Sequence, residues 1–227
     1  MKRIVKGQEP EALRLWRAQN ASIPENLKYD RGNWPTRAVK VQMLVEQGYL
    51  CAYTMQSIAT EDHCHIEHVV PQSQPGQPPH LNVDYHNLLA CSPGNRPPPN
   101  WNPKYSYGAQ FKGAIYVDEN NLVSPLREDV ERRFHYGADG SVIASARDAA
   151  AVSTIRILYL DHPQLVELRK AAINERILDA DPPLSVEEAE VLSVEVMAVN
   201  SAGRFSEFCL AISQVAEWYT GVMKEPG

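Results

Sequence analysis

The spacing of apolar side chains predicts two helices near the start of the chain. The first covers residues 11–20, and the second covers residues 35–47. The second opens with a proline, which suits the first turn of a helix, and Gly48 is expected to end it. The apolar residues that mark these helices are Leu13, Leu15 and Trp16 in the first, and Val39, Met43 and Leu44 in the second.

The middle of the chain has a different pattern. Polar and apolar residues alternate over residues 65–70, which predicts a half-buried strand. Two runs rich in turn-forming residues, 72–79 and 92–103, break any longer element. Between them, residues 83–91 are expected to form a short helix that carries Asn87, with Asn82 placed to cap it.

Regular structure is expected again after residue 116. The Asp139-Gly140 pair within residues 136–143 predicts a hairpin. Ser185 and Glu188 have the spacing of a capping box at the start of a helix. Three further helices are expected, over residues 146–160, 162–178 and 204–222.

These elements predict an α+β fold that is mostly helical. We divide the chain into an N-terminal helical region (1–48), a central region (49–115) and a mainly helical C-terminal region (116–227). With 44% hydrophobic and 22% charged residues, the composition excludes collagen-like, disordered and disulfide-scaffold proteins. No run of 18 apolar residues occurs, and no apolar segment follows the basic start, so we expect a cytoplasmic protein with reduced cysteines and no membrane partner.

Charge is distributed unevenly along the chain. The formal net charge is −6, and residues 160–227 alone carry 12 acids and 5 bases. Residues 1–50, in contrast, carry 9 bases and 5 acids. The N-terminal two-thirds can therefore approach a phosphate backbone, whereas the acidic C-terminal third is expected to repel one.

Chemistry-bearing residues gather in the central region. Glu67 and His68 lie in the predicted strand, and Asn87 lies in the segment that follows the turn-rich loop. A strand, a loop and a helix in this order can bring these three side chains around one small volume. A neutral imidazole beside a carboxylate and a metal ion suits the activation of water for phosphodiester hydrolysis.

The same residues carry a family resemblance. Glu67-His68-x-x-Pro71-x-Ser73, followed by Asn87-Leu88-Leu89, resembles the HNH (ββα-metal) endonucleases. Flanking segments are similar to the PtuB family, which supplies the HNH nuclease of Septu anti-phage systems, including versions attached to retrons. These segments are Ile4-x-Lys6-Gly7-x-Glu9-Pro10, Glu46-Gln47-Gly48-x-Leu50-Cys51-Ala52-Tyr53 and Thr154-Ile155-x-Ile157-Leu158-x-Leu160. The resemblance covers most of the chain and implies that residues 49–115 form a ββα-metal (HNH) nuclease core, flanked by the N-terminal helices and the C-terminal helical region.

The resemblance implies a role for each residue of the motif. His68 would be the general base, and Asn87 would hold the loop that orients it. Glu67 would ligate a divalent metal, Mg²⁺ or alternatively Mn²⁺. Asn95 is expected as the further metal ligand, with Asn100 and Asn102 as alternatives.

Two further groups are candidates for contact with nucleic acid. His65 either contacts phosphate or packs, and the residues favour neither. Lys104 and Lys112 are separated by aromatic residues, a pattern that suits nucleic-acid binding, although an ordinary hairpin face fits nearly as well. The intervening aromatic residues are Tyr105, Tyr107 and Phe111.

The chain departs from many HNH relatives in its cysteines. Those relatives bind a structural zinc through two Cys-x-x-Cys pairs, but here Thr54 and Gly94 stand where the partners of Cys51 and Cys91 would be. Two thiolates do not complete a tetrahedral site, so we expect no structural zinc and a packed Cys51–Cys91 pair. Cys209 is expected in the core.

The resemblance also implies partners. A PtuA-type ATPase would bind and regulate the protein, with the acidic C-terminal region as the docking surface, and a retron reverse transcriptase with its msDNA is a further candidate. DNA is the favoured substrate, and RNA such as tRNA is the alternative. Two other hypotheses compete with a nuclease: a degenerate HNH module that serves as a binding or scaffold subunit, and a zinc-binding adaptor, which the missing thiols weaken.

Overall fold

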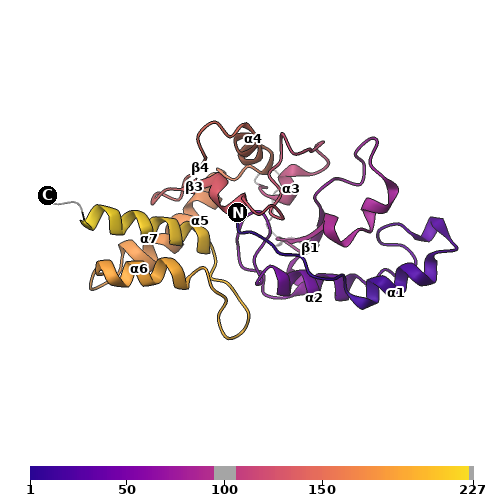
Figure 1. Ribbon diagram of the computed structural model, residues 1–227, viewed down its shortest axis with the longest axis horizontal. Coiled ribbons are helices and arrows are strands. Elements are labelled where there is room, and N and C mark those ends of the chain that lie inside the picture. Colours follow the sequence, from indigo (N-terminus) through magenta and orange to yellow (C-terminus); the bar gives the residue numbers. More distant parts are fainter. Residues whose placement is uncertain (95–105, 225–227) are drawn as a thin grey trace.

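The computed structural model describes residues 1–94 and 106–224 and has an α+β fold. About 43% of the chain is helical, and two small antiparallel sheets supply the strands, so the predicted fold class is confirmed at this level. The molecule is elongated, with α1 at one end, α6 and α7 at the other, and the N-terminus near the middle (Figure 1). Within the described ranges, no helix has the length and apolar character needed to cross a membrane.

The two N-terminal helices form where the apolar spacing predicts them. Helix α1 is Glu11–Asn20, and α2 is Thr36–Glu46. Leu13 and Trp16 are buried on α1, but Leu15 lies on its exposed side. Gly48 follows α2 with a φ of 55°, a left-handed conformation that glycine adopts without strain.

The central region is built on one pair of strands. Strand β1, His65–His68, pairs antiparallel with β2, Leu88–Cys91, so that His65 lies opposite Cys91 and His68 opposite Leu88. The strands are connected by residues 69–87, which form turns and 3₁₀ segments and return the chain to β1 just after Asn87.

The helix expected over residues 83–91 is wrong. Tyr85–Asn87 forms only a 3₁₀ turn, and Asp84 rather than Asn82 caps it, by accepting a hydrogen bond from the His86 amide. All four residues of β2 are buried. A short apolar run of this kind is equally compatible with a buried strand and a buried helix, and only pairing with β1 decides between them.

The second sheet is the hairpin predicted around Asp139-Gly140. Strand β3, Phe134–Tyr136, pairs antiparallel with β4, Val142–Ala144. Gly140 lies in the turn with a φ of 80°. The hairpin packs beside α7, because Gln214 accepts a hydrogen bond from the Tyr136 amide and donates one to the Phe134 carbonyl.

The C-terminal helices follow the predictions with shifted ends. Helix α4 begins after the Asp148 cap, and the capping box of Ser185 and Glu188 opens α6 as expected. The last helix begins at Cys209 instead of residue 204, because Phe208 has a φ of 53° and the Phe205 amide bonds back to Gly48. The helices of this part are α3 Ala109–Lys112, α4 Ala149–Leu158, α5 Pro163–Ile173 with a π-helical turn Asn174–Leu178, α6 Val186–Glu195 and α7 Cys209–Lys224.

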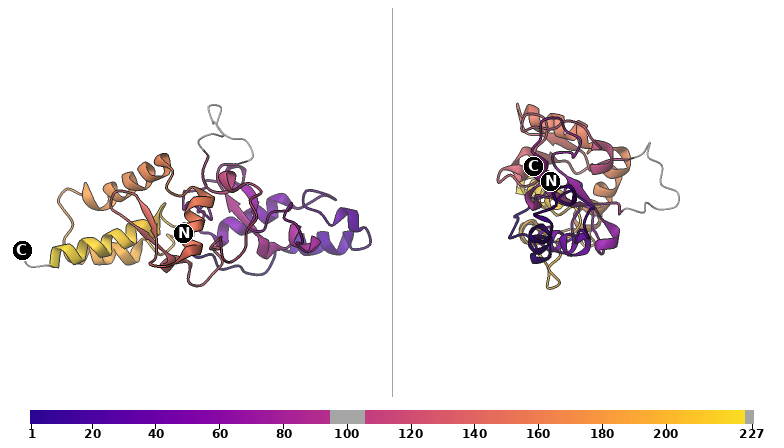
Figure 2. Two further views of the ribbon diagram at one scale, coloured as in Figure 1. Left: turned by 90° about the horizontal axis from the view of Figure 1, so that it is seen from above. Right: turned by 90° about the vertical axis from the view of Figure 1, so that its right-hand side faces the viewer.

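A continuous buried core connects the three regions of the chain. It extends from Met1 to Ala216 and includes both strands of the central pair. Segment 204–208 returns to the central region, where the Arg204 guanidinium lies 3.7 Å from the centre of the Tyr49 ring and donates to the Ile58 carbonyl. The left view in Figure 2 shows α7, in yellow, and α1, in indigo, at opposite ends of the molecule. The division into three regions stays a prediction.

Candidate active site

Strand β1 sends Glu67 and His68 in different directions. Consecutive residues of a strand point to opposite faces, and the burial of β1 alternates accordingly. Glu67 contacts Lys112 of α3, whereas the His68 ring packs against Tyr29 and the loop after β1. The side chains of Glu67 and His68 therefore make different contacts, although the Lys112 ammonium donates both to the Glu67 carboxylate and to the His68 carbonyl.

The Glu67 carboxylate is paired with a buried lysine. Its Oε1 atom lies 2.6 Å from Lys112 Nζ, and the same ammonium donates to the His68 carbonyl at 3.0 Å. The side chain of Lys112 is 1% exposed and that of Glu67 is 12% exposed. Burial raises the pKa of the Glu67 carboxyl, and the Lys112 ammonium opposes that rise.

The prediction that Lys112 belongs to an exposed nucleic-acid strip is wrong, because the residue is buried against Glu67. Phe111 is exposed, and its ring packs against Tyr159. Lys104 and Tyr105 lie outside the described residues. The sequence carries no signal for the Glu67–Lys112 pair, since 45 residues separate the two positions.

The His68 ring has one nitrogen fixed by the backbone. Its Nε2 atom lies 3.0 Å from the Asn82 carbonyl oxygen, which only accepts hydrogen bonds, so Nε2 carries the ring proton. Nδ1 is then the unprotonated nitrogen, and its contact is Gln72 Nε2 at 3.5 Å. Burial lowers the pKa of the imidazole, which keeps Nδ1 free to accept a proton near neutral pH.

Asn87 ties together the two ends of the loop that follows His68. Its Oδ1 atom accepts from the Val70 amide at 2.8 Å, and Nδ2 donates to the carbonyls of Val70 and Leu81 at 3.1 and 3.0 Å. Leu81 is next to Asn82, whose carbonyl holds the His68 ring. The Asn87 side chain thus bonds to both ends of the loop segment next to His68.

His65 lies in β1 on the same face as Glu67. Its Nδ1 atom is 2.6 Å from the Pro93 carbonyl oxygen, so Nδ1 is the protonated nitrogen of the neutral ring. The half-buried ring therefore has a backbone partner on one side. Contact between the His65 Nε2 atom and a phosphate group stays a prediction.

A carboxylate oxygen is available for a divalent cation. Glu67 Oε2 accepts no hydrogen bond from the described residues, and carboxylate and amide oxygens are ligands that Mg²⁺ prefers. Residues 1–94 and 106–224 contain no group of three His, Cys, Asp or Glu side chains placed to hold a metal ion. Asn95, Asn100 and Asn102, the amides expected as further ligands, lie outside the described residues.

Thr54 and Gly94, which stand where the resemblance would place cysteines, make other contacts. The thiols of Cys51 and Cys91 are both buried, and burial and the neighbouring Cys51 thiol raise the pKa of Cys91, which matches the packed pair expected from the sequence. Thr54 is buried beside Gly108. A Cβ atom on Gly94 would overlap the Asp62 carbonyl oxygen, so a side chain at position 94 requires the backbone to shift. Cys209 is buried in the core, as predicted.

Comparisons with known proteins give no class for this site. The chain matches neither the models of protein families nor the curated protein sequences against which it was compared. The residues and contacts of the site are therefore the basis for its chemistry.

Proposed function

We propose that the protein is a metal-dependent HNH endonuclease that hydrolyses phosphodiester bonds in nucleic acid. One observation carries the proposal: Glu67 and His68 end the first of two antiparallel strands, Pro71 follows in the loop, and Asn87 closes the loop that holds His68. His68 combines burial, a fixed Nε2 proton and an unprotonated Nδ1 atom, which suit a general base near neutral pH.

The residues divide the work as follows. His68 Nδ1 takes the proton of the attacking water, and the Asn82 carbonyl stabilises the resulting imidazolium through the Nε2 proton. During this step Asn87 holds the two ends of the loop, at Val70 and Leu81, in place through hydrogen bonds. Glu67 would hold the divalent metal together with Asn95, and the bound metal would supply positive charge for the scissile phosphate and the leaving oxygen.

The direct test is cleavage of nucleic-acid pools. The purified protein, with and without a PtuA-type ATPase, is incubated with DNA and RNA pools and Mg²⁺. We expect cleavage of DNA that chelation of the metal abolishes, and cleavage of RNA alone would change the substrate but not the reaction class. If neither pool is cut with the ATPase present, the nuclease proposal fails.

A second candidate function is a non-catalytic HNH module that acts as a scaffold. The observation in its favour is the missing zinc cysteines, since Thr54 and Gly94 carry packing contacts in their place. The hydrogen bonds of Asn87 weigh against the scaffold hypothesis. They hold the loop around His68, which a scaffold does not need, and they do not shape a binding surface. We keep the nuclease as the leading proposal and place it in the cytoplasm.

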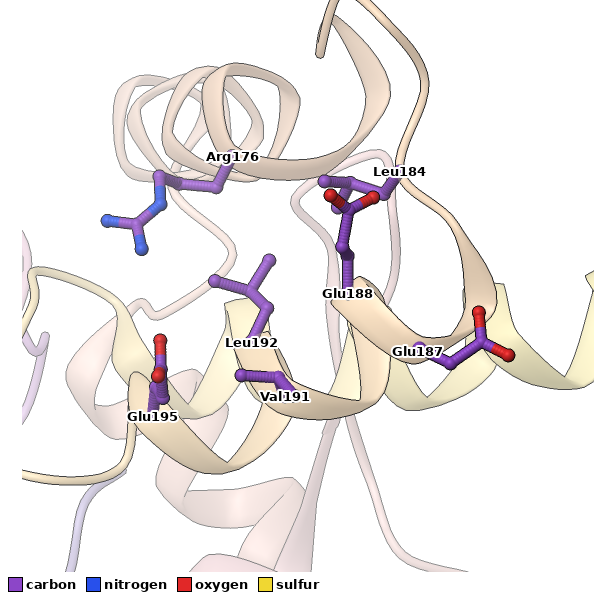
Figure 3. A pocket seen from close by; sticks show the side chains of 7 residues that line it. All are labelled: Arg176, Leu184, Glu187, Glu188, Val191, Leu192 and Glu195. Carbon is purple, nitrogen blue, oxygen red and sulfur yellow. The ribbon is translucent and has the colours of Figure 1, made fainter.

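We also propose that the C-terminal region docks the partner ATPase of an anti-phage system. A groove of about 450 Å³ lies between the π-helical turn and α6 (Figure 3). Leu184, Val191 and Leu192 give it an apolar floor. Its other lining residues are Arg176, Glu187, Glu188 and Glu195. An apolar floor with a mainly acidic rim fits a basic amphipathic segment. A retron reverse transcriptase with its msDNA is the further partner candidate.

Substitution of Val191 by glutamate is expected to weaken co-purification of the ATPase at least tenfold, because the change places a charge on the floor of the groove. Val191 is 54% exposed, so the fold should tolerate the change. Val45→Glu is the matched control, since Val45 is a helical valine that is 57% exposed outside the groove. Equal loss of binding in both variants, or in neither, would refute this docking surface.

A further inference from the structure

The Glu67–Lys112 pair has a charge balance that bears on metal binding. The pair is neutral, and Lys112 is almost completely buried with its ammonium on Glu67 Oε1. A divalent cation on the same carboxylate would bring the local charge to +2 if Lys112 stayed in place. Two cations that share one half-buried carboxylate repel each other strongly, because little solvent separates them.

The second contact of Lys112 fixes this arrangement. The ammonium also donates to the His68 carbonyl, so it is held by both residues of the motif. Helix α3, which carries Lys112, has a glycine at each end and packs against α4. Lys112 is therefore positioned by the fold against Glu67 and is not a flexible surface side chain.

We propose that Lys112 is a built-in competitor of the divalent metal at Glu67. In the protein without nucleic acid, its ammonium weakens metal binding, and a bound phosphodiester offsets the excess positive charge and supplies a further oxygen ligand. Metal loading is thereby favoured when nucleic acid is present. This inference rests on the proposed function, because it takes Glu67 as the metal ligand.

Titration with Mn²⁺, followed by the electron paramagnetic resonance signal of the free ion, tests the competition without any cleavage. We expect Lys112→Met to bind Mn²⁺ at least tenfold more tightly than the wild-type protein in the absence of nucleic acid. Lys112→Arg keeps the charge and should bind as weakly as wild type. An unchanged or weaker affinity of Lys112→Met would overturn the proposal.

Lys40 offers a matched control. It is also a buried lysine in the same part of the fold, but its ammonium donates to the carbonyls of Glu61 and Cys64 instead of a carboxylate. Lys40→Met removes a buried charge away from Glu67. If it tightens Mn²⁺ binding as much as Lys112→Met does, a general electrostatic effect explains the result and the competition at Glu67 is refuted.

A measurement on the unsubstituted side chain keeps the test independent of how well Lys112→Met folds. In protein with ¹³C-labelled lysine, the Lys112 Cε resonance is assigned by its absence from Lys112→Arg. With a nucleic-acid duplex bound to the His68→Ala protein, Mg²⁺ should shift this resonance. No shift while Mg²⁺ binds would overturn the inference.

Failure of the inference can be distinguished from failure of the proposed function. If the wild-type protein cuts nucleic acid with Mg²⁺ but Lys112→Met leaves Mn²⁺ affinity unchanged, only the competition is refuted. If no form of the protein binds Mn²⁺, with DNA or RNA present or absent, the metal site at Glu67 and the inference are refuted together.

Discussion

Replacement of His68 by alanine is expected to slow nucleic-acid cleavage by about 10²–10⁴-fold, the usual effect of removing a general base. Nδ1 is the proton acceptor in the proposed reaction, and no neighbouring group replaces it, because Gln72 does not titrate and the Asn82 carbonyl holds the opposite nitrogen. A cleavage time course with matched protein concentrations measures the effect. Phage defence should be lost in parallel, with partner binding unchanged.

Thermal melts separate this loss from unfolding. The His68 ring packs edge-on against Tyr29 at 4.9 Å between ring centres, so the substitution also removes a buried contact. His86→Ala is the control, because His86 is an exposed histidine one residue before Asn87. Cleavage by His68→Ala at a rate close to wild type, with an unchanged melt, would refute the nuclease mechanism and favour the scaffold hypothesis.

Glu67→Ala and Asn87→Ala should differ from His68→Ala in kind. Loss of a metal ligand is expected to be partly rescued by higher metal concentration. Loss of the Asn87 side chain leaves three backbone groups of the loop without their partner, so its effect should appear in the melt as well as in the rate. The three variants together distinguish base, ligand and positioning residue.

Gly140→Ala is expected to destabilise the fold by about 3 kcal/mol, which corresponds to a fall of roughly 6–12 °C in melting temperature for a chain of this size. A Cβ atom there would overlap the Val166 carbonyl oxygen and lie 2.8 Å from the Lys170 amide nitrogen, both in the backbone of α5. The Gly140 carbonyl also accepts from the buried Arg169 guanidinium, so a shifted turn would lose that bond.

Gly203→Ala is the control for backbone conformation. Gly203 has a φ of 71°, similar to the 80° of Gly140, but a Cβ atom there meets nothing within 4 Å. Gly203→Ala should therefore lower the free energy of unfolding by about 1 kcal/mol, the cost of placing alanine in a left-handed backbone conformation. Equal destabilisation in the two variants, measured by chemical denaturation, would show that contact with α5 adds nothing at Gly140.

The Asp139-Gly140 turn shows what local sequence determines. Its residues specify a hairpin by their own backbone preferences, and the hairpin forms. Helix α1 and the capping box of α6 are predicted for the same reason, since each signal lies within a few consecutive residues. The motif of Glu67, His68 and Asn87 is of another kind: it rests on a resemblance to HNH endonucleases, and the roles of its residues stay a prediction.

Contacts between residues far apart in the sequence decide the features that local sequence does not specify. Residues 88–91 are compatible with helix or strand until β1 pairs with them, and the last helix begins at Cys209 because the preceding loop packs on Gly48. Likewise, nothing in the sequence indicates that Lys112 lies buried against Glu67. The sequence by itself determined the local elements and the motif. Only the tertiary structure decided that residues 88–91 form a strand and that Lys112 is the partner of Glu67, because both depend on which distant segments the core brings together.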